Sequence, residues 1–230
     1  MHPLNDFIPR IFECLEEPGF EARLAGWKER FWTLTGIPHP GSTGYEARMH
    51  AFEEWVLVDF TEHDRILPGT SPAPVDRASL LALLVRCGAL SGELEALARD
   101  LVASQLGLYV LMAPWTGPAW FRELVSGADF RLDEGPPVPG LEPGQILQTR
   151  LFVHGGRTWA GLGRLIHPLG ATETIHRLVE RLHARGRTRL EILHLLAKLA
   201  WRADNYPRHA PELFYDLSHP LVQDLVVGWR

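Results

Sequence analysis

The chain has 230 residues, of which 46% are hydrophobic, and a formal net charge of −5 at pH 7. This length is sufficient for one large or two small domains with a hydrophobic core, whereas the acidic balance argues against a dedicated nucleic-acid-binding protein. Two cysteines without a CxxC motif, no apolar run long enough to cross a bilayer, and no signal-peptide pattern at the N-terminus predict a cytoplasmic protein without a membrane segment.

The first part of the chain is predicted to be helical up to about residue 105. Apolar residues recur at helical spacing in 5–17, 20–36 and 45–60, and Pro- and Gly-containing stretches separate these segments. The proline-rich stretch 61–75 predicts an irregular crossing, after which Asp76 and Ser91 are expected to cap two further helices. The sequence therefore predicts a helical domain over residues 1–105.

Residues 106–168 have the pattern of a small β module. Ser126-Gly127 predicts a tight turn between strands at 121–125 and 129–133. Gly155-Gly156 predicts a hairpin turn with positive φ between strands at 145–153 and 158–167. Four or five short strands in this space favour a small antiparallel barrel of SH3-like or OB-like type.

The rest of the chain, residues 169–230, is predicted to be a C-terminal helical extension. Apolar spacing indicates helices over 171–185 and over 189–203, the second capped by Thr188. Pro220 interrupts any single helix through the tail. The predicted fold class is thus α+β, with an N-terminal helical unit, a small antiparallel β barrel and a C-terminal helical extension.

Residues 45–170 contain several short motifs: a helix end of the form F-x-x-W-x-x-x-D-[YF] at 52–60, a Leu-Pro-Gly-Thr turn at 67–70, and the pairs Ser126-Gly127, Pro143-Gly144 and Arg150-Leu151. These motifs resemble a group of poorly characterised bacterial proteins that often carry a C-terminal SEC-C metal-binding domain. The cysteine-rich SEC-C segment does not occur in this chain, so its metal function is not carried over. The resemblance implies the order of domains and implies no activity.

A Glu-x-x-His pattern recurs three times in the C-terminal helices. Residues i and i+3 share a helix face, and di-iron bundle proteins use this spacing for metal ligands. A metal-dependent enzyme is therefore an alternative function, although Arg177 and Arg181 between these residues are typical of a solvated, mixed-charge face. The candidate ligands are Glu173, His176, Glu180, His183, Glu191 and His194.

Motifs for nucleophilic or nucleotide chemistry are not found. The sequence has no G-x-S-x-G elbow and no P-loop, and Gly161-Leu162-Gly163 lacks the third glycine and the following helix of a dinucleotide fingerprint. Hairpin turn chemistry explains this segment better. We therefore expect no cofactor and a non-enzymatic protein.

The β module contains more aromatic residues than the core of one small barrel should hold. Some of these rings bind a partner from the surface, or the flanking helices cover them. The first interpretation predicts an adaptor that binds a protein partner or a second copy of itself. The residues expected to contact the partner are Trp115, Trp120, Arg122, Arg150, Arg157, Trp159, Phe214 and Leu225.

A single-stranded nucleic-acid binder is the third candidate function, because aromatic platforms beside cations bind such strands. The cations in question are Arg122, Arg131, Arg150, Arg157 and Arg164. However, all but two of the 23 Lys and Arg residues are arginine, a bias typical of GC-rich genomes. Arginine content is therefore not evidence of phosphate recognition here.

Overall fold

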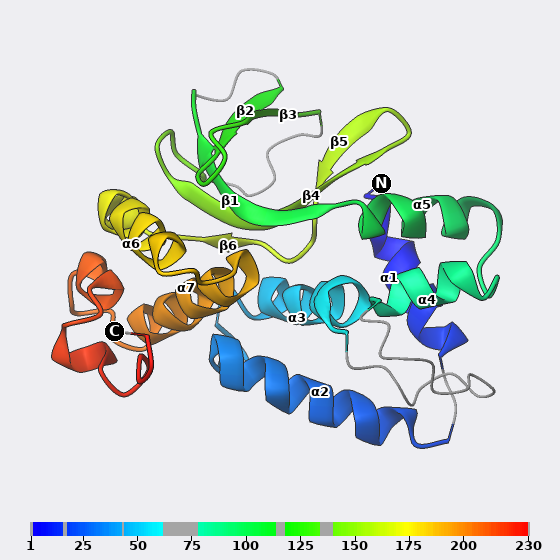
Figure 1. The fold of residues 1–230 in the computed structure, drawn as a ribbon, viewed down its shortest axis with the longest axis horizontal. Helices are drawn as coiled ribbons and strands as arrows, with labels where there is room; N and C mark the ends of the chain where they lie inside the picture. Colours follow the sequence, from blue (N-terminus) through cyan, green and yellow to red (C-terminus); the bar gives the residue numbers. More distant parts are fainter. Residues whose placement is uncertain are drawn as a thin grey trace.

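The computed structural model describes residues 2–15, 18–42, 44–61, 78–113, 118–133 and 140–229. It is an α+β protein in which helices pack below and beside a curled antiparallel sheet, which confirms the predicted fold class at this level (Figure 1). The predicted irregular crossing, its cap at Asp76 and the residue Trp115 lie outside the described residues.

The N-terminal helices share one core rich in aromatic rings. Phe31 lies 5.3 Å from Trp55, and Trp55 lies 4.7 Å from Phe60, measured between ring centroids. The fifth helix begins after Ser91 as predicted, whereas the fourth begins after Ser79, whose hydroxyl accepts a hydrogen bond from Ala82 N. The elements are α1 Leu4–Cys14, α2 Phe20–Thr35, α3 Tyr45–Glu54, a π-helical turn η1 Trp55–Asp59, α4 Leu80–Arg86 and α5 Gly92–Val102.

The sheet is antiparallel throughout, in the order β3-β2-β1-β4-β5, with β6 paired to β4. Both predicted turns are confirmed, because Gly127 has a φ of 71° and Gly155 and Gly156 have φ values of 59° and 74°. The strands are β1 Gln105–Leu111, β2 Ala119–Glu123, β3 Asp129–Leu132, β4 Ile146–His154, β5 Arg157–Ala160 and β6 Leu165–Ile166.

The sheet curls until its two edge strands, β3 and β5, meet. Asp133 N donates a hydrogen bond to Thr158 O at 3.3 Å, and Thr158 N donates to Asp133 Oδ2 at 3.1 Å. Side chains on the concave side form a separate small core that includes Tyr109, Phe121 and Leu147. The β module is therefore filled by its own side chains.

The C-terminal helices α6, Thr172–Ala184, and α7, Arg189–Asp204, form within one residue of the predicted bounds. Thr188 and Glu191 form a reciprocal capping box at the start of α7. Three short 3₁₀ turns complete this part: η2 Leu169–Ala171 before α6, and η3 Pro211–Tyr215 and η4 Pro220–Val222 in the tail. Phe214, from the tail, packs in one core with Leu108 of β1.

Strand β4 connects the cores. It is buried on both sides over most of its length. On its outer side, Ile146 belongs to the core of the C-terminal helices and Phe152 to the core of the N-terminal helices. Between these two apolar ends, the same side carries Gln148 and Arg150. The middle of β4 is therefore the point at which the three parts of the chain meet.

The N-terminal and C-terminal helices also contact each other directly. Trp201 Nε1 of α7 donates a hydrogen bond to Ile37 O at 2.6 Å, and Lys198 Nζ donates to Thr33 O at 3.0 Å. Helices α2, α3 and α7 consequently lie together below the sheet (Figure 1). Among the described helices, none has the length and apolar content that crossing a bilayer requires.

We expect Gly163→Ala to lower the free energy of unfolding by about 1–3 kcal/mol, because overpacking displaces backbone or side chains. Gly163 lies between β5 and β6, and a Cβ there would come within 2.6 Å of Ala51 Cα in α3. Urea denaturation of the variant measures the loss.

The matched control is Gly26→Ala in α2, where no atom lies within 4 Å of the added Cβ. Alanine in a helix interior is expected to raise stability there by about 0.5–1 kcal/mol. Equal stability of Gly163→Ala and the wild-type protein would contradict the close packing of this loop on α3.

Candidate functional site

The outer face of the β2–β3 hairpin is the exposed side of the sheet. Along β2, Trp120 and Arg122 are exposed, while the residues that alternate with them are buried. Trp120 is 51% exposed and pairs across the sheet with Arg131 of β3. An indole of this exposure on a paired strand is a candidate contact for a partner.

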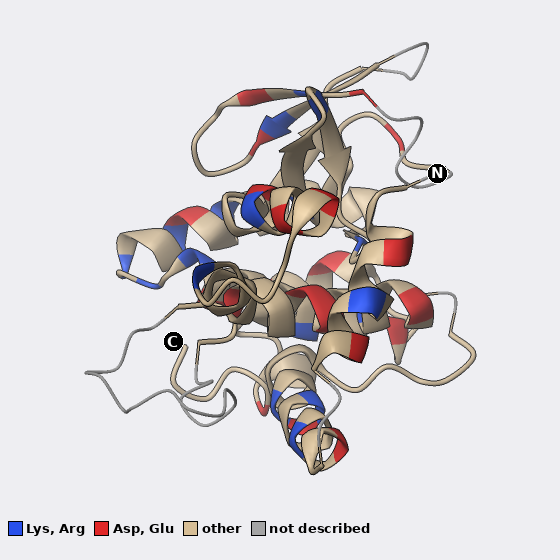
Figure 2. Cartoon of the chain, turned by 90° about the vertical axis from the view of Figure 1, so that its right-hand side faces the viewer, with Lys and Arg blue, Asp and Glu red and all other residues tan. Residues whose placement is uncertain are grey.

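The arginines on this face are paired with aspartates. Arg122 donates to Asp129 from Nε at 2.8 Å and from Nη2 at 3.1 Å, which raises the pKa of Arg122 and lowers the pKa of Asp129. Arg131 Nε lies 3.2 Å from Asp133 Oδ1. Figure 2 likewise shows acidic and basic residues interspersed over the helices. Arg122 and Arg131, the arginines described on β2 and β3, are therefore both paired, whereas phosphate binding favours unpaired positive charge.

Trp159 has a different environment from Trp120. It is half-buried on β5, where its ring meets His2 edge-on at 5.4 Å and its Nε1 donates to His154 O at 3.2 Å. It also packs against the core of the N-terminal helices. The contacts of Trp159 are thus largely internal.

The remaining residues predicted to bind a partner are dispersed. Arg150 is only 1% exposed and Phe214 is fully buried, so neither belongs to the exposed surface. Leu225 is half-buried in the tail, and Arg157 is exposed at the β4–β5 turn. Trp115 lies outside the described residues. Of the predicted set, the structure brings Trp120 and Arg122 together on one face.

The three Glu-x-x-His pairs do not converge. On α6, Glu173 interacts with Arg177 and His176 with Glu180, each at 3.5 Å, and His183 is exposed. On α7, Glu191 caps the helix, whereas His194 is buried. Within the described ranges, no group of three or more His, Cys, Asp or Glu side chains is arranged to hold a metal ion.

A buried charge cluster that sequence reasoning missed lies at the middle of β4. Arg150 donates from Nη2 to Asp59 Oδ2 and from Nη1 to Ser104 Oγ, the latter at 2.9 Å. Its Nε lies 3.9 Å from Glu54 Oε2. In the π-helical turn the Phe60 N–H bonds to Trp55 O, five residues earlier, at 2.8 Å. This wider turn brings residues five apart towards the same side, so Glu54 and Asp59 both reach one arginine.

The Gly161-Leu162-Gly163 segment holds the carboxylate of Glu54. Glu54 Oε1 accepts hydrogen bonds from Leu162 N at 2.6 Å and from Gly163 N at 2.9 Å. A Cβ at Gly161 would lie 2.6 Å from the same carboxylate, so only glycine permits this approach. Burial raises the pKa of Glu54, and Arg150 and the two N–H groups oppose that rise. The segment binds a carboxylate from another element, a role that its local pattern did not indicate.

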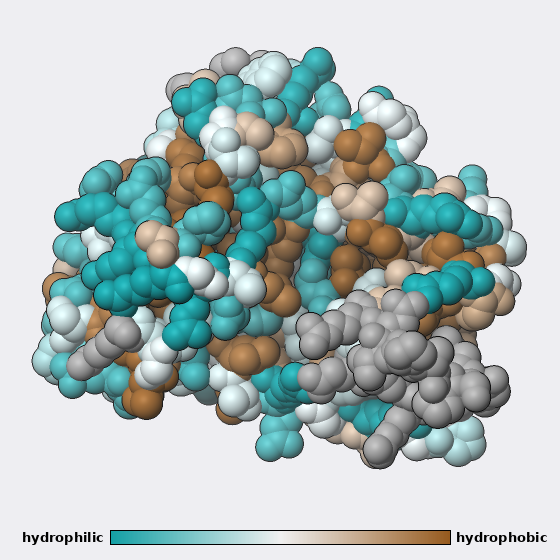
Figure 3. All heavy atoms as spheres, in the orientation of Figure 1, coloured by the Kyte–Doolittle hydropathy of each residue, from teal (hydrophilic) through white to brown (hydrophobic). Residues whose placement is uncertain are grey.

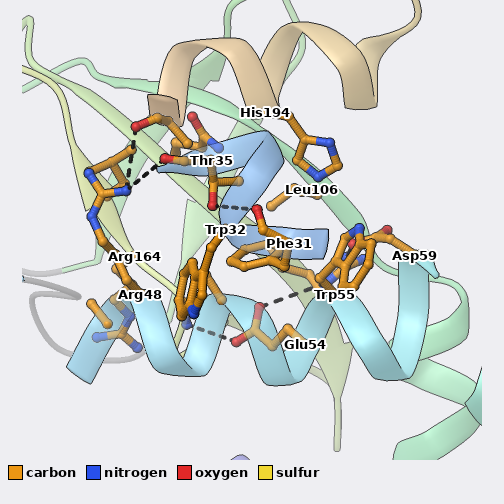
Figure 4. A pocket seen from close by; sticks show the side chains of 17 residues that line it. Phe31, Trp32, Thr35, Arg48, Glu54, Trp55, Asp59, Leu106, Arg164 and His194 are labelled. Atoms are coloured by element: carbon orange, nitrogen blue, oxygen red, sulfur yellow. Dashed lines mark hydrogen bonds and ion pairs between the residues drawn. The ribbon is translucent and has the colours of Figure 1, made fainter. Parts of the chain in front are cut away.

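A pocket of about 50 Å³ adjoins this cluster (Figure 4). His194 of α7 lines this pocket and is 9% exposed. The centroid of its ring lies 6.2 Å from that of Phe31 and 6.4 Å from that of Trp55. Burial lowers the pKa of His194 to about 4, so its ring is neutral at pH 7. Its Nε2 and Arg150 Nε are both buried without a hydrogen-bond partner among the described residues.

Compared with protein-family models, curated proteins and solved structures, the chain matches none of them. The resemblance to SEC-C-bearing bacterial proteins therefore stays a prediction. The function has to be inferred from the exposed β2–β3 face and the buried cluster themselves.

We expect Arg150→Met to lower the free energy of unfolding by about 3–5 kcal/mol, since it leaves Asp59 without its buried counter-charge. Adding Asp59→Asn should recover part of this loss, because the orphaned charge is then removed. Guanidinium denaturation of both variants measures the effect. Arg157→Met, at an exposed turn, is the control and should change stability by less than about 0.5 kcal/mol. Comparable stability of Arg150→Met and Arg157→Met would contradict the importance of the cluster.

Stability should decrease as the pH falls from 6.5 towards about 4, since the unfolded chain then binds protons that the folded chain excludes. Burial holds the pKa of His194 at about 4 and that of His167 at about 3, both below the ordinary value of 6.5. His194→Leu should reduce the slope of the free energy of unfolding against pH by up to about 1.4 kcal/mol per pH unit, which corresponds to the uptake of one proton.

The measurement is chemical denaturation at several pH values, with His183→Leu on the exposed face of α6 as the control. His183→Leu should retain the wild-type slope. Identical slopes for the two variants would mean that His194 is not excluded from protonation by the fold.

Proposed function

We propose that this chain is a non-enzymatic protein-interaction module that binds its partner through the outer face of the β2–β3 hairpin, centred on Trp120. The observation that supports this proposal is the exposure of Trp120 on the outer face of β2, where the neighbouring strand β1 is covered by helices. The outer side chains of β1 and β4, such as Leu108 and Phe152, pack beneath helices. Among the described residues, no helix packs on the outer side chains Trp120 and Arg122 of β2.

The topology of the sheet supports the same choice of surface. Going around the sheet the order is β1-β2-β3-β5-β4, with β3 and β5 meeting at Asp133 and Thr158. Since neighbouring paired strands are antiparallel, β3 and β5 run in the same direction. We infer a partly open five-stranded barrel of OB-like rather than SH3-like type. Barrels of this type bind their ligands, which include oligonucleotides and oligosaccharides, on the face of strands 2 and 3.

The charge on this face favours a protein partner. The Arg122–Asp129 pair leaves the surface beside Trp120 without net charge. Met112, next to the end of β1, is exposed and donates its backbone N–H to Trp120 O at 2.9 Å, which adds an apolar neighbour. An uncharged surface with an indole at its centre suits an apolar side chain of a protein segment, with peptide groups bonding to the paired charges at its rim.

Single-stranded nucleic acid is the second candidate ligand, because a base could stack on the indole of Trp120 in an OB-like barrel. The aspartates beside Arg122 and Arg131 weigh against it. A metal-dependent reaction at the Glu-x-x-His pairs gains no support from their separated positions.

We expect Trp120→Ala to abolish capture of the partner from an extract of the protein's own cells while changing stability by less than about 0.5 kcal/mol. The physical reason is that the indole is exposed in the isolated chain and covered only in the complex. Affinity capture with quantitative mass spectrometry, together with thermal denaturation, measures both quantities.

The matched control is Val153→Ala, a 59% exposed apolar residue at the end of β4, which should retain capture. Retention of the same partner by Trp120→Ala would contradict the proposal. Binding of single-stranded oligonucleotides that weakens steeply as salt rises and requires Trp120 would instead favour the second candidate.

A further inference from the structure

An apolar strip begins at Trp120 and crosses the outer face of the sheet. Trp120 is 51% exposed and Met112 is 44% exposed. Met112 N donates a hydrogen bond to Trp120 O at 2.9 Å, so the two residues lie beside each other, one at the end of β1 and one on β2. Both side chains point outward, because side chains alternate along a strand and the adjacent residues Leu111 and Phe121 belong to the inner core.

Leu169, just before α6, continues this strip on the β4 side of Met112. Gly144 N donates to Leu111 O at 2.8 Å, so Gly144 lies beside the end of β1. A Cβ on Gly144 would lie 3.8 Å from Leu169 Cδ1, and Leu169 is 45% exposed. Exposed apolar residues scattered among polar ones are common on protein surfaces and occur elsewhere on this chain (Figure 3). Here three of them, Leu169, Met112 and Trp120, follow one another across the sheet.

The strands beneath the strip are paired on both sides. Strand β2 lies between β3 and β1, and β1 lies between β2 and β4. An extended segment therefore cannot add to the sheet as a further strand at this surface. Its peptide groups would lie unpaired against apolar side chains, which costs free energy. A helix satisfies its peptide groups internally, so it can dock on such a surface through side chains alone.

The spacing across the strip also matches a helix. Neighbouring strands lie about 4.8 Å apart. On one face of a helix, residues at i, i+4 and i+7 follow one another about 5–6 Å apart, because one turn rises about 5.4 Å. Alternate residues of an extended segment are about 7 Å apart and lose register with the strip.

The extent of the strip favours a single segment over a second folded copy of the chain. A stable interface between two folded proteins uses about 20–30 residues on each side. The strip has three apolar side chains, and the Arg122–Asp129 pair lies beside it. Three side chains in a row correspond to about two turns of one helix.

We propose that the partner bound at the Trp120 face presents an amphipathic helix, which lies across β2 and β1 and places apolar side chains at i, i+4 and i+7 on the strip. The inference rests on the proposed function and specifies the partner segment for the same surface. The peptide groups left free at the end of such a helix can bond to Arg122 and Asp129 at the rim.

The test uses the full chain labelled with ¹³C in its methionine methyl groups, of which there are three, at Met1, Met49 and Met112. Met112 reports binding at the strip, and Met49, which packs against the core of the N-terminal helices, is the internal reference. The probe is a peptide of about 18 residues, long enough to form a helix, built from Ala, Glu and Lys with Leu at i, i+4, i+7 and i+11. The comparison peptide differs by one central proline, which breaks the helix.

We expect the helical peptide to shift the Met112 signal saturably and to leave the Met49 signal in place. The proline peptide should bind at least about tenfold more weakly, because it cannot hold its leucines on one face. Leu169→Ser should weaken binding of the helical peptide about tenfold, since one apolar contact is lost. The matched control is Val153→Ser, an exposed apolar residue outside the strip, which should retain the affinity.

Equal binding of the two peptides would overturn the helix assignment and indicate an extended segment. The absence of a Met112 shift with either peptide would also overturn it, as would full affinity of Leu169→Ser for the helical peptide. These outcomes leave the proposed function to its own test. If Trp120→Ala loses the partner while neither peptide binds, the helix assignment alone fails, whereas a Trp120→Ala variant that still captures the partner contradicts the proposed function itself.

Discussion

The buried guanidinium of Arg150 is the group on which the arrangement of the three parts depends. An arginine side chain stays protonated, so a buried arginine requires hydrogen-bond acceptors around it. Those acceptors come from Asp59 in the π-helical turn and Ser104 before β1, and Glu54 lies beside them. Separating the helices from the sheet would leave this charge without partners. The cluster therefore fixes the position of the helices relative to β4.

The parts of the fold that could be predicted from the sequence depend on neighbours along the chain. Helices α2 and α7 follow from apolar spacing, and the β4–β5 turn follows from two consecutive glycines. The Arg150–Asp59 contact joins residues 91 positions apart, and it needs both a π-helical turn and the β1–β4 pairing. The resemblance quoted both of these residues, but their spacing carries no local sign of contact. The interactions of this cluster could therefore not be predicted from the sequence alone.

The same limit applies to the candidate sites, as a pair of tryptophans and one of the Glu-x-x-His pairs show. Trp120 and Trp159 are the same residue type on two strands of one sheet, and contact with the N-terminal helices makes Trp159 half-buried whereas Trp120 is exposed. Glu191 and His194 share the i, i+3 spacing of metal ligands. However, α7 is amphipathic at its start and buried further on, so the first residue caps the helix at the solvent edge and the second enters the interior.

The sharing of one strand between two cores has a consequence for how the chain folds as it is synthesised. Phe152 of β4 belongs to the core of the N-terminal helices, and the carbonyl groups of Ile37 and Thr33 accept hydrogen bonds from side chains of α7. When the first hundred or so residues emerge from the ribosome, these contacts do not yet exist. The aromatic surface of the N-terminal helices is then incompletely covered. Contacts of such long sequence separation slow folding and prolong exposure of apolar surface. The N-terminal helices can thus reach their final packing only after α7 has been made.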